Sequence, residues 1–323
     1  MQTIRWGIIG VGNVCEVKSG PGFYKNPASQ LLAVMRRDAD KARDFAQRHN
    51  VPHWYNNAAE LLNNPDIDAV YIATPPAQHL DYALAALAAG KHVYIEKPVT
   101  LNARECRELI AAANRNSYKV CVAHYRRALP HFIKIAELIA GGVIGAPLIA
   151  QIDLLRPAPT KHAPDNWRLN PAISGGGLFH DLAPHQLDLM VHWFGPVKNA
   201  AGFALNQRQL TSAADLVQGW AQLQSGVALQ GRWHFGVAPE LARDSGEIIG
   251  TQGSIQFNFF GDGTIKLTTA SGTQTLALDY PAHVQQPLIA QVNQYFRGDG
   301  SNPCSLEDAL ASMELIDNFS SPR

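Results

Sequence analysis

Three side chains are suited to proton transfer: Lys97, and, far from it in the chain, Asp181 and His185. Lys97 stands at the end of an apparent strand, in the run Glu96-Lys97-Pro98. Asp181 and His185 are four residues apart, so a helix would project both from one face. A histidine titrates near neutral pH, and a neighbouring carboxylate fixes its tautomer and favours its charged form. These residues predict an acid/base site.

The histidine-rich run 175–188 leaves two other interpretations open. His180, His185 and Asp188 can be helix residues satisfied by local hydrogen bonds, as is common for an isolated Asp-x-x-x-His spacing. A metal site is the second alternative, but the sequence offers no clear third and fourth ligand elsewhere. No metal is therefore predicted.

A glycine-rich turn near the N-terminus points to a bound dinucleotide. Residues 4–9 read as a buried strand that runs directly into Gly10-Val11-Gly12. The first glycine allows the tight bend, and the second lets backbone N–H groups approach a pyrophosphate, so contacts are predicted from Gly10, Gly12, Asn13 and Val14. Cys15 replaces the usual third glycine, which we interpret as a slightly wider contact between helix and strand. An ordinary turn between a strand and a helix is the alternative.

The next strand, residues 30–35, ends where a ribose-binding carboxylate usually lies. Arg36 and Arg37 follow it. A guanidinium can hold the 2′-phosphate of NADP through a bidentate, charge-assisted contact, whereas NAD requires an acid at this place. NADP is therefore predicted, with NAD as the alternative if Asp38 reaches the 2′-hydroxyl. The segment 18–22 is too rich in Gly and Pro for a regular helix and is expected to loop over the cofactor.

The composition excludes several classes of protein. With 27 basic and 27 acidic side chains, the chain has no electrostatic footprint for nucleic acid or an anionic membrane. Its four cysteines show no paired spacing, and three lie in apolar patterns typical of reduced core thiols. The first strand begins at Ile4, with no basic-then-apolar leader and no apolar stretch of ~18 residues. We expect a cytoplasmic protein that binds neither nucleic acid nor membrane.

The elements that position these side chains fall into two regions. Within residues 1–123, short apolar runs alternate with helical patterns, which predicts βαβ units and a parallel sheet. Asn102 and Glu105 form a capping-box pair at the start of one helix. The expected strands are residues 4–9, 30–35, 69–73, 92–95 and 119–123, and the expected helices are residues 39–48, 78–89 and 103–114.

The pattern changes in residues 124–323. Helices are expected over 130–140 and 177–194, a strand over 147–155, and a last helix capped by Ser305 with Asp308. Further strands follow one another without helices between them, which predicts an antiparallel sheet. These strands are residues 200–205, 216–223, 227–234, 254–259, 264–269 and 275–278. The 323 residues, 46% of them hydrophobic, thus predict an α/β protein with a dinucleotide-binding domain, 1–123, and a substrate and oligomerisation domain, 124–323.

Three motifs together resemble those of the glucose-fructose oxidoreductase, inositol dehydrogenase and rhizopine-catabolism group, often called Gfo/Idh/MocA. The resemblance spans nearly the whole chain. The motifs are Gly10-x-Gly12, then Ile72-Ala73-Thr74-Pro75-Pro76-x-x-His79 with Glu96-Lys97-Pro98, and finally Gly175-Gly176-Gly177 ahead of Asp181 and His185. The resemblance implies a Rossmann domain, followed by an α+β domain with a large open antiparallel sheet through which members form homodimers or homotetramers.

The same resemblance implies hydride transfer between a nicotinamide and a carbonyl or hydroxyl carbon of a sugar, polyol or related small molecule. The chain looks most similar to the NADP-dependent sugar-ketone reductases of that family, such as anhydrofructose reductase. His185 would exchange the proton with the substrate oxygen, Lys97 would hold that oxygen, and Asp181 would orient the imidazole or accept a substrate hydroxyl. Lys97 and His185 are then expected to face one nicotinamide ring.

Further contacts are implied by the resemblance. Thr74 and Pro75 line the cofactor's edge, His79 opens the next helix, and Arg168 turns back toward the nicotinamide or pyrophosphate. Glu96 is placed at the cofactor with Lys97. For Thr74 and His79 a capping or packing role is the alternative, and Arg126 and Arg127 either reach the substrate or form surface pairs.

Two rival functions share this fold. One is a sensor that binds the dinucleotide without turnover, like the repressor of the yeast galactose regulon, although the intact Lys97, Asp181 and His185 argue against it. The other is a glycosidase that keeps its nicotinamide bound and uses transient oxidation at C3. Release of NADPH into solution separates these from a dehydrogenase. The loop 156–173 is expected to shape the substrate pocket.

Overall fold

The computed structural model describes residues 3–159 and 166–320, and the chain divides into two compact units. Unit 1 comprises Met1–Tyr125 with Pro281–Ala309, and unit 2 comprises Arg126–Tyr280 with Leu310–Arg323. The sequence pattern placed residues 281–309 in the second domain. In the structure they join unit 1, because hydrogen bonds fasten them there: Asn293, for example, accepts one from the indole of Trp6 at 2.9 Å.

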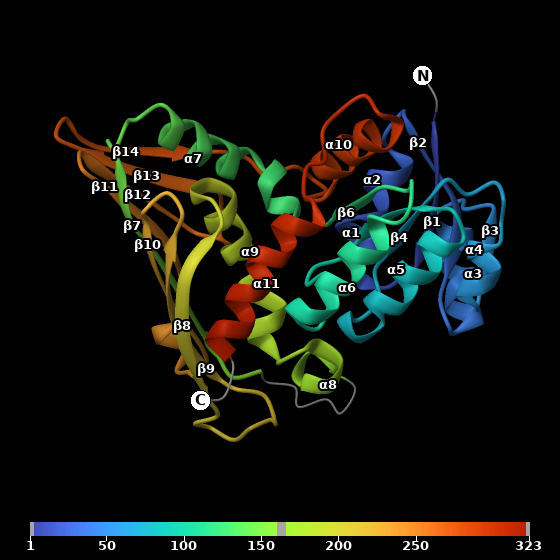
Figure 1. Cartoon of the computed structure of the whole chain (residues 1–323), viewed down its shortest axis with the longest axis horizontal. Coiled ribbons are helices and arrows are strands. Elements are labelled where there is room, and N and C mark those ends of the chain that lie inside the picture. The colour runs from blue at the N-terminus through green and yellow to red at the C-terminus, as the bar shows by residue number, and fades with distance from the viewer. Residues whose placement is uncertain (1–2, 160–165, 321–323) are drawn as a thin grey trace. The chain divides into compact units, whose positions relative to one another are not determined.

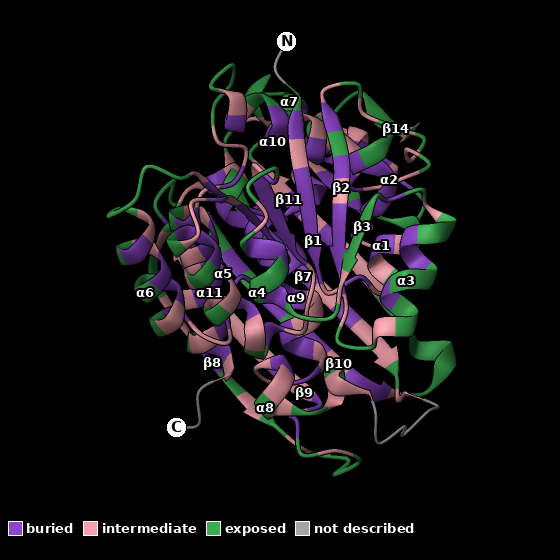
Figure 2. Cartoon of the chain, turned by 90° about the vertical axis from the view of Figure 1, so that its right-hand side faces the viewer, coloured by how far each residue is buried: buried purple, intermediate pink, exposed green. Residues whose placement is uncertain are grey.

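A six-stranded parallel sheet forms the centre of unit 1, in the order β3-β2-β1-β4-β5-β6. Its strands are β1 (Ile4–Ile9), β2 (Ser29–Met35), β3 (His53–Tyr55), β4 (Ala69–Ile72), β5 (His92–Ile95) and β6 (Val120–Val122). Five of them were predicted. The short β3 was missed because its three residues are exposed or half-buried and leave no apolar pattern. The central strand β1 is buried along almost its whole length (Figure 2).

Helices connect these parallel strands, as parallel pairing requires. They are α1 (Asn13–Val17), α2 (Gly20–Tyr24), α3 (Ala39–Arg48), α4 (Ala58–Leu62), α5 (His79–Ala88) and α6 (Ala103–Ala113), with α10 (Gln286–Arg297) added from the later segment. The predicted Asn102 cap of α6 is confirmed, since its side chain accepts a hydrogen bond from the Glu105 N–H at 3.0 Å, while the Glu105 side chain accepts from the N–H of Leu101 at 3.1 Å. The helix α11 (Leu306–Ser320) starts in unit 1 and ends in unit 2.

The prediction that the segment 18–22 is an irregular loop was wrong, whereas its expected place over the cofactor stays a prediction. Its last three residues begin the short helix α2, and all three are buried. A Cβ on Gly20 would lie 2.0 Å from the carbonyl oxygen of Cys15, and one on Gly22 would lie 2.5 Å from the side chain of Ile289 in α10. The glycines are therefore present because α1, α2 and α10 pack closely.

Unit 2 is built on an eight-stranded sheet in the order β14-β13-β12-β11-β7-β10-β9-β8 (Figure 1). Its strands are β7 (Pro147–Pro157), β8 (Val197–Leu205), β9 (Leu216–Leu223), β10 (Ala228–Val237), β11 (Arg243–Gly250), β12 (Gly253–Phe257), β13 (Thr264–Thr269) and β14 (Gly272–Ala277). All pairs are antiparallel except β7 with β10, which is parallel. The strand β11 was not predicted.

Helices cover one face of this sheet: α7 (Pro130–Ala140) packs on β13, and α9 (Leu178–Phe194) packs on β9 and β10, while the four-residue α8 (Pro171–Ser174) packs on α9. Paired glycines make room for α11 on the sheet. Gly202 and Gly219 are cross-strand neighbours, and a Cβ on either would lie within 3 Å of Phe319 in α11. Trp233 of β10 donates to the side chain of Gln186 in α9 at 2.6 Å. The sheet thus fixes α9, which carries the predicted acid/base residues.

All four cysteines are free thiols and buried, as expected for core positions. Burial raises the pKa of the Cys15 thiol to about 12, so this residue stays protonated and inert near neutral pH. Among residues 3–159 and 166–320, no helix has the length and apolar character needed to cross a membrane.

Candidate functional site

The glycine turn of unit 1 is held in a shape that only a residue without a side chain can take. Gly10 has a φ of +95°, and a Cβ there would lie 2.7 Å from the side chain of Thr74. The N–H groups of Gly10 and Val11 both donate to the carbonyl of Met35, at 2.9 and 3.1 Å. The N–H groups of Asn13 and Val14 open α1, where backbone donors have no partner inside the helix. The turn and the loop after β4 therefore meet with backbone exposed between them.

A buried polar atom lies beside this turn. The hydroxyl of Thr74 is enclosed yet makes no hydrogen bond within the described ranges. Buried hydroxyls normally have a partner, and an exception commonly marks a place that a ligand or water completes. The cradle at Gly10 and the hydroxyl of Thr74 both fit a bound dinucleotide.

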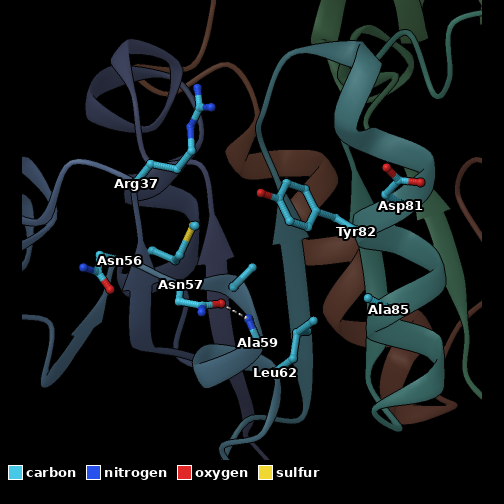
Figure 3. Close-up of a pocket in the computed structure, with 10 residues that line it drawn as sticks. Arg37, Asn56, Asn57, Ala59, Leu62, Asp81, Tyr82 and Ala85 are labelled. Atoms are coloured by element: carbon cyan, nitrogen blue, oxygen red, sulfur yellow. Dashed lines mark hydrogen bonds between the residues drawn. The ribbon is translucent and has the colours of Figure 1, made fainter.

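A cavity of about 610 Å³ opens at the end of β2 (Figure 3). Arg37 and Tyr82 project from different elements at its border, Arg37 from the segment after β2 and Tyr82 from α5. Asn56 was not predicted because β3 and α4 left little sequence signal, and Tyr82 was not predicted although its helix α5 was. The full lining is Met35, Arg37, Asn56, Asn57, Ala58, Ala59, Leu62, Asp81, Tyr82 and Ala85. Asn57 also caps α4, accepting a hydrogen bond from the Ala59 N–H at 2.8 Å.

The structure separates the residues considered for the ribose end of the cofactor. Arg37 lines the cavity, whereas Arg36 does not, although its N–H donates to Tyr55 of β3. Asp38 caps α3: its carboxylate accepts from the Lys41 N–H at 3.1 Å and pairs with the Lys41 ammonium at 3.1 Å. These contacts, the backbone hydrogen bond first, lower the pKa of Asp38. The carboxylate of Asp38 is therefore engaged as the N-terminal cap of α3.

Glu96 is buried at the end of β5, next to Lys97. Three donors hold its carboxylate: the hydroxyl of Tyr71, the side-chain amide of Gln285 at 2.7 Å, and the backbone N–H of Lys97 at 3.2 Å. Gln285 also accepts from the hydroxyl of Tyr94 at 3.5 Å. Because the carboxylate of Glu96 accepts a hydrogen bond from the Lys97 N–H, this network fixes the position of the Lys97 backbone. Gln285 lies 189 residues away in sequence and could not be predicted from any motif.

His79 ties together the loops that follow β4 and β5. Its ring nitrogens lie 2.7 Å from the carbonyl oxygen of Thr74 and 2.9 Å from that of Pro98. Burial lowers the pKa of His79, although both carbonyls oppose that shift. His79 thus positions Thr74 and the Lys97-Pro98 turn through hydrogen bonds, whereas its predicted contact with the cofactor stays a prediction, as do those of Thr74 and Pro75.

In unit 2, α9 brings Asp181 and His185 onto one side of the helix, as their spacing predicted. Asp181 accepts a hydrogen bond from Arg168 at 3.1 Å, and the Arg168 guanidinium lies 4.4 Å from the ring centroid of Trp167. His185 is buried, and its ring meets the ring of Phe260 edge-on, with centroids 5.9 Å apart. Lys97 belongs to unit 1 and these residues to unit 2.

The three glycines before α9 each have a local structural reason. Gly175 and Gly177 take positive φ values of 91° and 84°, which favour glycine. A Cβ on Gly176 would lie 2.1 Å from the imidazole of His180. The turn therefore determines where α9 begins, and its backbone at Gly176 packs against the imidazole of His180. Residues 160–165 of the expected substrate loop 156–173 lie outside the described residues.

We expect stability to decrease when the pH falls from about 6.5 toward 4, and His180 to contribute to this decrease. Burial lowers the pKa of His180 to about 4, despite an opposing backbone contact with Gly176. Above the pKa that His180 has in the unfolded chain, its imidazole is neutral in both the folded and the unfolded protein. Below it, the unfolded chain binds the proton first, so the free energy of unfolding falls.

Urea unfolding of the wild type and of His180→Gln at about pH 7.5 and 4.5 checks this expectation. The variant should lose less stability than the wild type across that interval. His131, whose pKa burial also lowers to about 4, remains in both proteins as an internal reference. Parallel losses in the two proteins would contradict the assignment to His180.

Arg127 and Asp188 form a buried ion pair and not a surface pair. Two guanidinium nitrogens of Arg127 donate to the two oxygens of Asp188, at 2.9 and 2.7 Å, and the side chains are 6% and 1% exposed. Arg126 is also buried, and its guanidinium donates to the carbonyl of Phe259. The alternative of surface pairs was therefore wrong for both arginines.

Comparison with known proteins agrees with this architecture. Residues 4–124 match the model of an oxidoreductase family with an NAD-binding Rossmann fold, and residues 132–256 match the Gfo/Idh/MocA C-terminal domain. The chain belongs to the Gfo/Idh/MocA family. It is therefore an oxidoreductase, and the predicted resemblance is confirmed. Family membership supports a nicotinamide dinucleotide as the cofactor without deciding between NAD and NADP.

Individual Gfo/Idh/MocA relatives cover nearly the whole chain. Oxidoreductase P35 from Formosa agariphila is 46% identical over 319 residues, which are 98% of each protein. A 1,5-anhydro-D-fructose reductase from Ensifer adhaerens is 28% identical over 96% of this chain and 93% of its own length. A 3-ketoreductase from Actinomadura kijaniata, solved with NADP and TDP-benzene, shares the fold with a TM-score of 0.81 at 22% identity, over 99% of this chain and 100% of its own.

Proposed function

We propose that this oxidoreductase uses NADP and catalyses the reduction of a carbonyl carbon, or the oxidation of the corresponding hydroxyl, in a sugar or polyol. The observation that carries this proposal is the buried carboxylate of Glu96, which holds the backbone of Lys97 at the carboxyl end of β5, in the same parallel sheet whose strand β1 leads into the Gly10 turn. Ligands of such sheets bind outside the carboxyl ends of the strands. The sugar class is supported by the 1,5-anhydro-D-fructose reductase and aldose-aldose oxidoreductase among the similar proteins.

Each predicted site residue would have a distinct role in hydride or proton transfer. The bound dinucleotide supplies or accepts the hydride. Lys97 would place its ammonium on the reacting oxygen and stabilise the negative charge that develops there. His185 would exchange the proton with that oxygen, and Asp181, held by Arg168, would orient the imidazole or accept a substrate hydroxyl. Gly10, Gly12, Asn13 and Val14 would face the pyrophosphate.

The choice of NADP rests on Arg37. Its guanidinium borders the cavity at the end of β2, while Asp38, the residue that would favour NAD, is engaged as the cap of α3 (Figure 3). A guanidinium recognises a phosphate ester through paired, charge-assisted hydrogen bonds. Tyr82 offers an aromatic face in the same cavity, suited to the adenine ring.

We expect Arg37→Ala to weaken NADPH binding by about 10- to 100-fold and to leave NADH binding nearly unchanged. Fluorescence titration of both reduced dinucleotides measures this. Arg43→Ala, which removes an exposed guanidinium paired with Asp40 on α3, is the matched control. Equal weakening of both dinucleotides by Arg37→Ala, or tighter binding of NADH than NADPH by the wild type, would contradict the proposal.

We also infer that the protein forms a homo-oligomer through the open face of the unit 2 sheet. Trp220 and Phe203 are 50% and 42% exposed there, next to a groove of about 580 Å³. Large aromatic side chains on a flat sheet face are enriched at interfaces between proteins. The groove is lined by Gln151, Ile152, Asp153, Ala201, Gly202, Phe203, Gln218, Gly219, Trp220, Gln230, Gly231 and Arg232.

A further inference from the structure

One aromatic ring in unit 2 gathers several basic side chains around the predicted catalytic histidine. The guanidinium carbons of Arg126 and Arg156 lie 4.4 and 5.0 Å from the centroid of the Phe260 ring. The same ring meets His185 edge-on at 5.9 Å. Two arginines and a histidine therefore share one neighbour, and a ligand that reaches His185 lies within the positive field of both arginines.

A half-buried acid, Asp244, lies close to this cluster. Asp244 is the acid beside both arginines, and its oxygens accept the N–H groups of Phe259 at 3.2 Å and Phe260 at 2.6 Å. Burial raises the pKa of Asp244, even though these hydrogen bonds and the two arginines oppose the shift. One half-buried carboxylate therefore lies beside two guanidiniums. A net positive cluster of this kind is stabilised when an anion binds.

Arg156 is the member of the cluster placed to meet a ligand. It is half-buried and lies two and four residues after Leu154 and Ile152 on β7, so its side chain lies on the same, helix-covered face of the sheet. It makes no hydrogen bond or ion pair with any residue in the ranges 3–159 and 166–320.

The opposite face of the sheet shows the usual arrangement for an arginine. There Arg232 and Arg243 both pair with Asp153, at 2.8 and 3.5 Å. The two arginines on the solvent-exposed face are therefore each paired with a carboxylate. Arg156, on the face that carries α9, has no such ion pair among the described residues.

We propose that Arg156 binds an anionic group of the substrate, a carboxylate or a phosphate ester, next to His185. This inference rests on the proposed function and narrows its substrate class from sugars in general to acidic or phosphorylated sugars. The planar guanidinium is suited to both groups because it donates two parallel hydrogen bonds to a pair of oxygens. The reacting carbon would then be set by the distance from this anion to His185.

The test compares matched probes on the NADPH-loaded protein: D-glucose, D-glucuronate and D-glucose 6-phosphate. Thermal stabilisation reports binding, and dinucleotide-linked absorbance reports turnover in the presence of NADP or NADPH. We expect an anionic probe to bind more tightly than D-glucose. Arg156→Gln should weaken that binding about 10- to 100-fold without changing the affinity for D-glucose or NADPH. The arms with glucuronate and the phosphate ester show which anion is preferred.

Arg243→Gln, on the opposite face of the same sheet, is the matched control and should bind all probes like the wild type. The proposal is overturned if neither anionic probe binds more tightly than D-glucose, or if Arg156→Gln weakens NADPH instead of the anionic probe. Failure of the proposed function gives a different pattern, because the protein would then bind neither reduced dinucleotide or would show no turnover with any sugar while anion binding still depended on Arg156.

Discussion

The Lys97→Met variant is expected to keep its fold and its affinity for NADPH while losing about 10²- to 10⁴-fold in kcat with a responsive sugar. Methionine resembles the lysine stem in length but carries no charge and no donor. In the proposed reaction the ammonium acts on the reacting oxygen, where charge develops only in the transition state, so its loss should lower kcat rather than raise KM.

We expect a large loss of kcat in Lys97→Met because the backbone of Lys97 is held in a fixed position. The backbone N–H of Lys97 donates to Glu96, and that carboxylate is itself held by Tyr71 and Gln285. His79 anchors the following residue through the Pro98 carbonyl. A charge held this way is already oriented when the substrate arrives, which avoids the cost of reorganisation during the reaction.

The measurement is single-turnover absorbance of the dinucleotide, together with NADPH titration and circular dichroism. Lys134→Met removes an exposed lysine paired with Glu137 on α7 and serves as the control, with kcat expected to be unchanged. A Lys97→Met enzyme that turns over at the wild-type rate would discard the assignment of Lys97. A sensor that binds dinucleotide without turnover would instead show no rate in either protein.

Local sequence signals predicted most of the fold. The helices α3 and α7 begin and end where their apolar periodicity placed them, and β1, β5 and β9 match the predicted runs. The sequence pattern succeeds here because the helices bury one face, while β1 and β5 are buried along almost their whole length and therefore form continuous apolar runs. It failed for β3, whose exposed residues carry no pattern, and for α2, whose glycines reflect close packing with distant residues instead of a loop.

Fewer features of the candidate site than of the fold could be predicted from the sequence. Spacing alone placed Asp181 and His185 on one side of α9, because helix geometry is local. No spacing could show that Gln285 supports Glu96, or that Arg37 borders the cavity while Arg36 does not. Those relations depend on which distant segments fold together. The expectation that Lys97 and His185 face one nicotinamide stays a prediction for the Lys97 and Arg37 experiments to test.

Asp188→Asn is expected to lower the free energy of unfolding by about 3 to 5 kcal/mol. Asp188 lies on α9, one turn beyond His185, and receives both hydrogen bonds from the buried guanidinium of Arg127. The asparagine keeps the size of the side chain but removes the negative charge that the buried guanidinium of Arg127 faces. Urea unfolding followed by tryptophan fluorescence measures the loss, and Glu137→Gln at the exposed pair with Lys134 should cost at most about 1 kcal/mol.

The double variant Arg127→Met with Asp188→Leu separates the two contributions of this pair. Apolar residues of similar volume remove both buried charges together, so most of the stability lost in Asp188→Asn should return. If stability returns but kcat does not, the pair orients α9 and, through it, His185 and Asp181. If the double variant is as unstable as Asp188→Asn, other contacts of these two side chains dominate, and the ion pair is not what holds this helix in place.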